Sequence, residues 1–162
     1  MILMQWYQIV KQQTLSKSQS YKDASGSTKS GFVNQTISIA NLMRTIRSGS
    51  YNEGVVFGTG NVEPTINDYT LSGEIVGNIS GSVSTEIIDN ETIKAIYAVT
   101  NNGSDSVTIG EIGICFKADS YGYGNGGGFA MFDRTVLETP ITIEPGGIGQ
   151  ITHLITMKTP TS

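Results

Sequence analysis

The side chains best suited to chemistry in this 162-residue chain are its single histidine and its single cysteine, His153 and Cys115. One of each cannot build a zinc site of ordinary composition within a subunit, and a lone cysteine excludes an internal disulfide. Both lie in apolar segments, so we expect a satisfied or partly buried histidine rather than a catalytic one, and a buried, unreactive thiol. A Ser-His-Asp arrangement remains open by residue count, although no G-x-S-x-G sequence accompanies the histidine.

Two other patterns offer chemistry of lower specificity. Asp119 near Asn125, or Asp89 with Glu91, could bind calcium through loop oxygens, but the chain has no EF-hand pattern. The Gly58-Thr59-Gly60 sequence lacks the G-x-G-x-x-G spacing of a phosphate-binding loop, and we expect no helix after it. Neither pattern predicts a ligand site.

Charged residues point to structure rather than catalysis. We expect the adjacent Asp133 and Arg134 to form structural or intersubunit ion pairs. The net charge is −4 and no short window contains a Lys/Arg cluster, which argues against nucleic-acid binding. The longest apolar stretches fall short of a membrane span. The sequence therefore predicts no enzymatic activity, no cofactor, no metal, and neither nucleic acid nor membrane as a partner.

The composition predicts a mainly β protein of one principal domain. The chain has 20 Ile and 10 Val against 6 Leu, and β-branched residues favour strands. Charged residues make up 15% of the chain, below the usual level of about 25%, while Ser and Thr number 35. We expect an antiparallel β-sandwich, jelly-roll-like, of roughly eight strands.

The clearest periodicity runs from Leu71 to Ile87, where apolar or glycine positions alternate with polar ones. One uninterrupted strand of this length would span about 55 Å, several times the usual strand. The glycines at 73, 77 and 81 offer bending points where the segment could cross between two sheets. The alternative is that the excess length pairs with a neighbouring subunit.

Further strands are predicted by apolar runs between turn residues. In Val107–Phe116 the apolar residues change from odd to even positions, and so from one face of a strand to the other. A one-residue bulge near Gly110-Glu111 would turn both groups of apolar residues toward one core. The segment 31–46 is expected to run from a strand into a short helical turn. The other predicted strands are 54–57, 93–99, 129–136, 141–143 and 150–158, with loops at 61–70 and 101–105 and a turn at 144–147.

The first 30 residues are predicted to form an N-terminal arm and a polar linker, ahead of a β-sandwich domain at 31–162. Apolar residues at near-helical spacing, including Ile2, Trp6 and Ile9, could pack on the same domain or dock on a neighbouring subunit. Residues 14–30 have almost no aliphatic side chains, which predicts a flexible linker or long loop.

The segment 117–128 is predicted to be a loop with five glycines and two tyrosines. Tyrosines on a flexible glycine frame resemble an antibody paratope in composition, and loops often carry binding residues. Tyr121, Tyr123 and Asn125 are therefore candidate interaction residues. A flexible hairpin tip without a binding role is the alternative.

From Gly54 onward, about two-thirds of the chain, three segments occur in a familiar order: VVFGTGNVEPTINDYTL, VTNNGSDSVTIGEIGICF and FAMFDRTVLETPITIEPGGIGQITHLITM. This succession resembles a group of tailed-bacteriophage structural proteins. The resemblance implies a β-sandwich virion component without enzymatic activity, located in the virion and assembled with copies of itself and other virion proteins. The positions it leaves open are a capsid decoration, a head fibre, a collar or a tail component, with a receptor- or glycan-binding fibre module as the alternative.

Deletion of residues 1–12 should leave the β-sandwich folded but abolish incorporation into particles, because the apolar arm would supply the contact with neighbours. Circular dichroism measures folding, and the protein content of purified particles measures incorporation. A truncated chain that still enters particles at the wild-type level would contradict the prediction.

Overall fold

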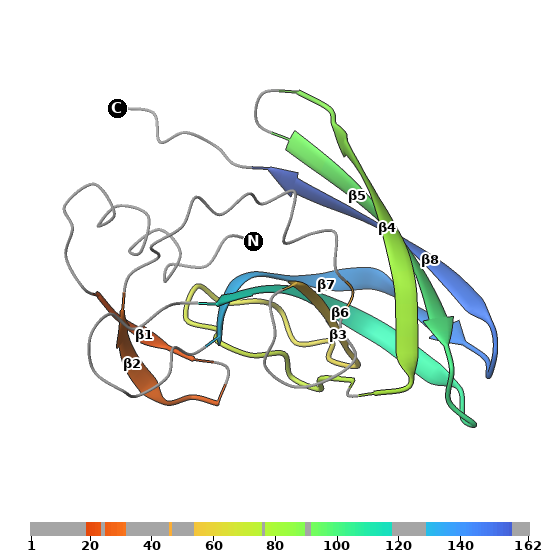
Figure 1. Cartoon of the computed structure of the whole chain (residues 1–162), viewed down its shortest axis with the longest axis horizontal. Coiled ribbons are helices and arrows are strands. Elements are labelled where there is room, and N and C mark those ends of the chain that lie inside the picture. The colour runs from red at the N-terminus through yellow and green to blue at the C-terminus, as the bar shows by residue number, and fades with distance from the viewer. Residues whose placement is uncertain are drawn as a thin grey trace.

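The computed structural model describes residues 19–23, 25–31, 46, 54–75, 77–89, 92–117 and 129–156 (Figure 1). Its eight strands are β1 (Gln19–Lys22), β2 (Thr28–Gly31), β3 (Gly54–Gly58), β4 (Ile79–Ile87), β5 (Thr92–Asn101), β6 (Val107–Lys117), β7 (Phe129–Ile143) and β8 (Ile148–Thr156). Two three-stranded antiparallel sheets, in the orders β3-β6-β7 and β4-β5-β8, pack as a sandwich. The predicted antiparallel β-sandwich is confirmed.

The core lies between the two sheets. Successive side chains of each strand point alternately inward and outward, and the inward-pointing ones build the core. On β8 the alternation is complete, with Gly149, Ile151, His153 and Ile155 buried and the residues between them exposed. Phe57 and Tyr97 meet across the core with their rings nearly perpendicular, at a centroid distance of 5.8 Å. The buried core residues are Val55, Phe57, Ile79, Ala95, Tyr97, Val99, Ile109, Ile112, Ile114, Ala130, Phe132, Ile143, Ile151 and Ile155.

The alternating segment 71–87 crosses from one sheet to the other. Its first part lies along β3, where the Ile75 amide donates to the Phe57 carbonyl at 2.8 Å. Its second part is β4, which pairs with β5 in the other sheet. The chain turns at Gly77 and Asn78, whose φ angles are +76° and +56°. The predicted bend at a glycine is therefore confirmed, and the bending position is Gly77.

Two register shifts fix which side chains of β6 and β7 face the core. The first lies between Ile109 and Glu111, as the change of apolar phase predicts, and leaves Gly110 as the bulged residue. The second places Phe132 between the paired positions Met131 and Asp133. After each bulge the alternation resumes in the opposite phase, so the polar residues that follow change faces.

β7 is longer than predicted. Two strands were predicted, at 129–136 and 141–143, but β7 continues through Pro140 to Ile143. Val136 pairs with Glu111 and Ile141 with Ile109, so residues 137–140 form an irregular section opposite the β6 bulge. Pro140 lies in this section of an edge strand, which has no partner in the register with β6, so a residue without an amide is compatible with the sheet.

The polar segment 14–30 is not wholly a linker or loop, because it contains most of the β1–β2 hairpin. The Asp23 carboxylate accepts bonds from the Ser25 and Ser27 amides at 3.0 and 2.9 Å, and Gly26 has a φ of +80°. These turn bonds substitute for the apolar burial that the segment lacks. Of the predicted strand and helical turn at 31–46, only Gly31, which ends β2, and Ile46, which bridges Val55, lie within the described residues.

Candidate functional site

The residues predicted to bind partners lie outside the described part of the chain. They are Ile2, Trp6, Ile9, Tyr121, Tyr123 and Asn125. Their roles therefore remain predictions. Among the described residues, the polar side chains gather at two other places, one on the outer face of the β3-β6-β7 sheet and one between the two sheets.

The outer cluster is centred on Glu111 and Arg134, which are 0% and 3% exposed. The bulge at Gly110 turns Glu111 away from the core, and the bulge at Phe132 does the same for Arg134 while turning Asp133 inward. The Arg134 Nε donates to Glu111 Oε2 at 2.8 Å. Two charges of opposite sign are thus buried together, which limits the cost of removing each from water.

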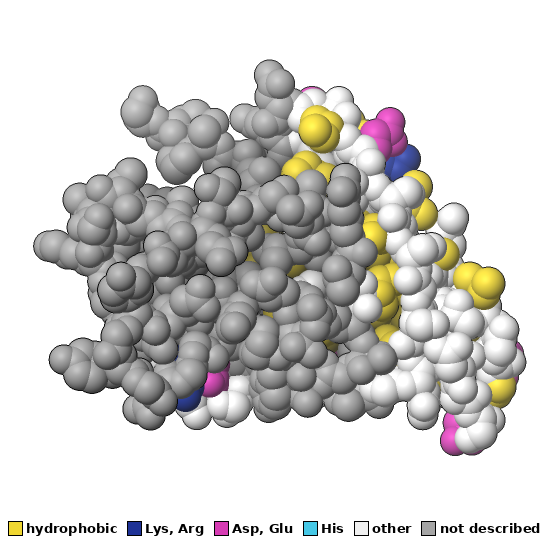
Figure 2. Space-filling view, viewed as in Figure 1, with side chains coloured by type: hydrophobic (Ala, Val, Ile, Leu, Met, Phe, Trp, Pro, Cys, Tyr) yellow, Lys and Arg dark blue, Asp and Glu magenta, His cyan; other side chains and the backbone are white. Residues whose placement is uncertain are grey.

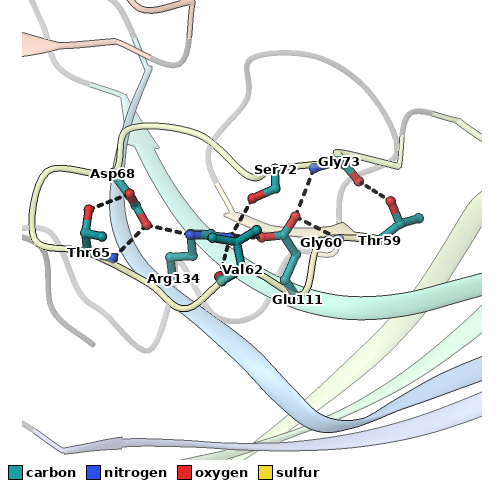
Figure 3. Close-up of polar contacts among 9 residues, drawn as sticks. All are labelled: Thr59, Gly60, Val62, Thr65, Asp68, Ser72, Gly73, Glu111 and Arg134. Carbon is teal, nitrogen blue, oxygen red and sulfur yellow. Dashed lines mark hydrogen bonds and ion pairs between the residues drawn. The ribbon is translucent and has the colours of Figure 1, made fainter.

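Arg134 uses its planar guanidinium to hold several acceptors at once (Figure 3). Besides Glu111, it donates from Nη1 to Asp68 Oδ2 at 2.5 Å, and from Nη2 to the Val62 carbonyl at 3.0 Å and Ser72 Oγ at 2.7 Å. The last three partners belong to residues 59–75, the segment that we call the covering loop. A lysine ammonium could not span this set of acceptors, because it lacks the rigid fork of five donors.

Glu111 binds the same loop with its other carboxylate oxygen. Oε1 accepts the Gly60 amide at 3.1 Å and the Gly73 amide at 3.0 Å. A Cβ atom on Gly58 would lie 2.6 Å from this oxygen, so the close approach requires glycine there. The Gly-Thr-Gly sequence therefore contributes an amide to an anion, as a phosphate loop would, but the anion is the protein's own carboxylate.

Asp68, within the covering loop, completes the cluster on the other side of Arg134 from Glu111. Its two oxygens accept the Thr65 amide at 2.9 Å and the Thr65 hydroxyl at 2.7 Å. Partial burial would raise the pKa of Asp68, but these bonds and the Arg134 guanidinium outweigh it and hold the pKa below its usual value. The Asp68 and Glu111 carboxylates raise the pKa of Arg134, although burial alone would lower it.

The covering loop gives the outer face of the sheet its own small apolar cluster. Val56, Leu71, Cys115 and Met131 are buried together there. Burial raises the pKa of the Cys115 thiol to about 12, and Glu74 adds to this effect. The raised pKa favours the protonated thiol at neutral pH, and the predicted burial of Cys115 is confirmed.

The second cluster joins the two sheets. His153 on β8 places Nε2 3.2 Å from Asp133 Oδ2 and 3.1 Å from Thr135 Oγ1 on β7, and Thr135 Oγ1 donates to Asp133 Oδ2 at 3.2 Å. Burial acts to raise the pKa of Asp133, and its hydrogen bond to His153 contributes to a net lowering. The histidine is 3% exposed and the aspartate 1%, so the predicted buried histidine is confirmed.

The geometry of this second cluster differs from a catalytic triad. In a triad the acid and the nucleophile bind opposite nitrogens of the histidine. Here Asp133 and Thr135 both lie on the Nε2 side, and Nδ1 is buried without a hydrogen-bond partner among the described residues. The cluster acts as a polar link between the sheets.

Comparisons with family models, with curated proteins and with solved structures find no match for this chain. Within the described ranges, no helix has the length and apolar character to cross a membrane. The same residues bring together no group of three or more potential metal ligands.

The predicted structural ion pairs are confirmed for Arg134, which pairs with Asp68 and Glu111 within the chain, while Asp133 contacts His153. Sequence reasoning did not identify Glu111 or Asp68. The available signal for Glu111 was a single acid within the apolar run of β6, between two glycines. No short-range pattern connects Asp68 with Arg134, because the two residues are 66 positions apart in the chain.

Replacement of Arg134 by Met should lower the free energy of unfolding by about 3–5 kcal/mol, because it leaves the Glu111 carboxylate buried without its cation. Arg134→Lys should restore only part of this loss. The matched control is Lys94→Met, which breaks the exposed Lys94–Glu86 pair at 3.5 Å and should cost about 1 kcal/mol or less. Urea denaturation measures each variant, and equal losses for Arg134→Met and Lys94→Met would contradict the assignment.

The lowered pKa of Asp68 makes part of the stability depend on pH. A carboxylate with a lowered folded-state pKa contributes stability above its unfolded pKa, about 3.9, and loses it as pH falls through the folded value. Asp68→Asn should therefore flatten the fall in unfolding free energy between about pH 5 and pH 2. Identical pH profiles for Asp68→Asn and the wild type would show that Asp68 is not held in this way.

Proposed function

We propose that this chain is a non-enzymatic structural protein of a tailed-phage virion, assembling in several copies as a capsid decoration, head fibre, collar or tail component. The observation that carries the proposal is the open character of the β4-β5-β8 sheet. Among the described residues, β4 and β8 each pair with β5 alone, so both outer strands present a free edge. Free edges are sites where another chain can add a strand.

The outer face of this sheet supports contact with protein rather than with a charged ligand. Its two charged side chains, Lys94 and Glu86, lie 3.5 Å apart and offset one another. The remaining positions on the face are Ser80, Ser82, Ser84, Thr92, Ile96, Ala98, Thr100, Ile148, Gln150, Thr152, Leu154 and Thr156. The surface around these strands in Figure 2 is correspondingly mostly white and yellow, with few charged atoms.

The positions of the acidic and basic residues also support a structural role. Glu111 and Arg134 hold the covering loop, and Asp133 and His153 link the two sheets. All four are buried, so a substrate in solvent could not reach them. The order of sequence segments that resembles tailed-phage structural proteins favours the virion as the location.

Purified tailed-phage particles from a lysate that produces this chain test the proposal. The chain should sediment with the particles through a density gradient and be found by mass spectrometry in a fixed ratio to the capsid protein. Recovery of the chain in the soluble fraction, with particles that lack it, would overturn the proposal.

The receptor- or glycan-binding module is the second candidate, favoured by the tyrosine and glycine content of residues 117–128. Particles carrying Tyr121→Ala with Tyr123→Ala separate the two. Unchanged host adsorption by intact particles counts against the binding module. Loss of adsorption by intact particles would favour it over a purely structural role.

A further inference from the structure

Within the described part of the chain, the outer edge of β8 has none of the features by which proteins prevent strands from pairing with one another. Natural edge strands are interrupted by lysine, proline or a bulge, or are covered by another segment. The nine residues of β8 contain no Lys, Arg, Asp, Glu or Pro, and the pairing of β8 with β5 has a regular register throughout. An edge of this kind is suited to forming a sheet with another strand.

The hydrogen bonds at the end of the sheet show which backbone groups of β8 face outward. The Asn101 amide donates to the Gly147 carbonyl at 3.1 Å, so this opposed pair is a hydrogen-bonded one. Bonded and non-bonded pairs alternate along an antiparallel ladder. The odd-numbered residues of β8 therefore bond to β5, and the amides and carbonyls of Ile148, Gln150, Thr152 and Leu154 point to the free edge.

The sequence of β8 is complementary to itself in the register that these groups allow. If two copies run antiparallel about a two-fold axis at Ile151, Ile148 lies opposite Leu154 of the second copy, and Gln150 lies opposite its Thr152. All of these are outward-bonding positions, so each pair can exchange two backbone bonds. Ile148 and Leu154 are 71% and 60% exposed, and this register places each beside an apolar side chain.

We propose that two copies of this chain pair through β8 in this register and form one continuous six-stranded sheet. The two-fold contact is closed, so it joins two chains without leading to an open fibre. It leaves the free edge of β4 at each end of the joined sheet. This pairing rests on the proposed function for its biological setting. It names a second copy of the chain as the partner in that assembly.

The edge of β4 is less suited than the edge of β8 to pairing with a second copy. The outer-face side chains of β4 are Ser80, Ser82, Ser84 and Glu86, so self-pairing there would bury hydroxyls and a carboxylate on that face, and the exposed Ile87 lies only at the end of the strand. On β8 the same kind of pairing covers two large aliphatic side chains per chain. Burial of apolar surface is the main driving force for association.

Light scattering of the purified full chain tests the pairing. The wild type should have twice the chain mass of 17.3 kDa at micromolar concentration. Leu154→Lys places a charge in the contact and should halve the measured mass, whereas the control Ser84→Lys, at an exposed position on β4, should not. A monomeric wild type, or a dimer unaffected by Leu154→Lys, would overturn the proposal.

Disulfide trapping tests the register independently of charge. A mixture of Gln150→Cys and Thr152→Cys chains should form mixed dimers under mild oxidation faster than either chain alone, because bonded cross-strand pairs have Cα atoms about 5.5 Å apart. The control mixture, Ser82→Cys with Ser84→Cys on β4, should cross-link slowly. Faster trapping of the control pair would place the contact on β4 and overturn the proposal.

The two proposals fail in different ways. Pairing through β8 in solution by a chain that is missing from particles would contradict the virion role and leave the dimer intact. A chain found in particles that stays monomeric and does not cross-link would contradict the dimer and leave the virion role intact.

Discussion

The position of the Arg134 guanidinium between Glu111 and Asp68 is the constraint on which the outer half of the molecule depends. A buried arginine needs acceptors on all sides, and here they come from one strand of the sheet and from the covering loop. Since Glu111 also accepts two amides of that loop, the loop is tied to the sheet at both of its ends and in its middle. The loop in turn buries Leu71 against Cys115 and Met131.

Two bulges make this arrangement compatible with an apolar core on the other face of the same sheet. Without the bulge at Phe132, Arg134 would follow the regular alternation and point between the sheets. With it, Arg134 points outward and Asp133 points inward, where it meets His153 of the opposite sheet. The bulge at Phe132 thus positions a residue of each polar cluster, Arg134 on the outer face and Asp133 between the sheets. Because these clusters use the buried charged side chains for structure, we propose that contacts with partners are made by the surfaces and edges of the β4-β5-β8 sheet.

Residue patterns predicted much of the sandwich. The change of apolar phase in Val107–Phe116 correctly indicated the bulge at Gly110, and the glycine spacing in 71–87 correctly indicated a crossing between sheets. These features depend on local alternation, which the sequence carries directly. The continuation of β7 through Pro140 was missed because proline is compatible with a strand only at a sheet edge, and edge position depends on the fold.

The polar clusters were harder to predict because their members are far apart in the chain. Glu111 is 51 residues from Gly60 and 23 from Arg134, and no spacing rule connects them. The β1–β2 hairpin was missed for a different reason, since the turn bonds of Asp23 stabilise a segment that has little apolar surface. Of the expected interaction residues, none lies in the described part of the chain, and their roles remain predictions.

The central claim is that Glu111 and Arg134 serve to hold the covering loop on the sheet. Amide hydrogen exchange of Gly60 and Gly73, the two loop amides that donate to Glu111, tests it most directly. Both amides should exchange as slowly as core amides of β6, and Arg134→Met should abolish this protection while β5 stays protected. Exchange of both amides at the rate of an open loop in the wild-type protein would contradict it.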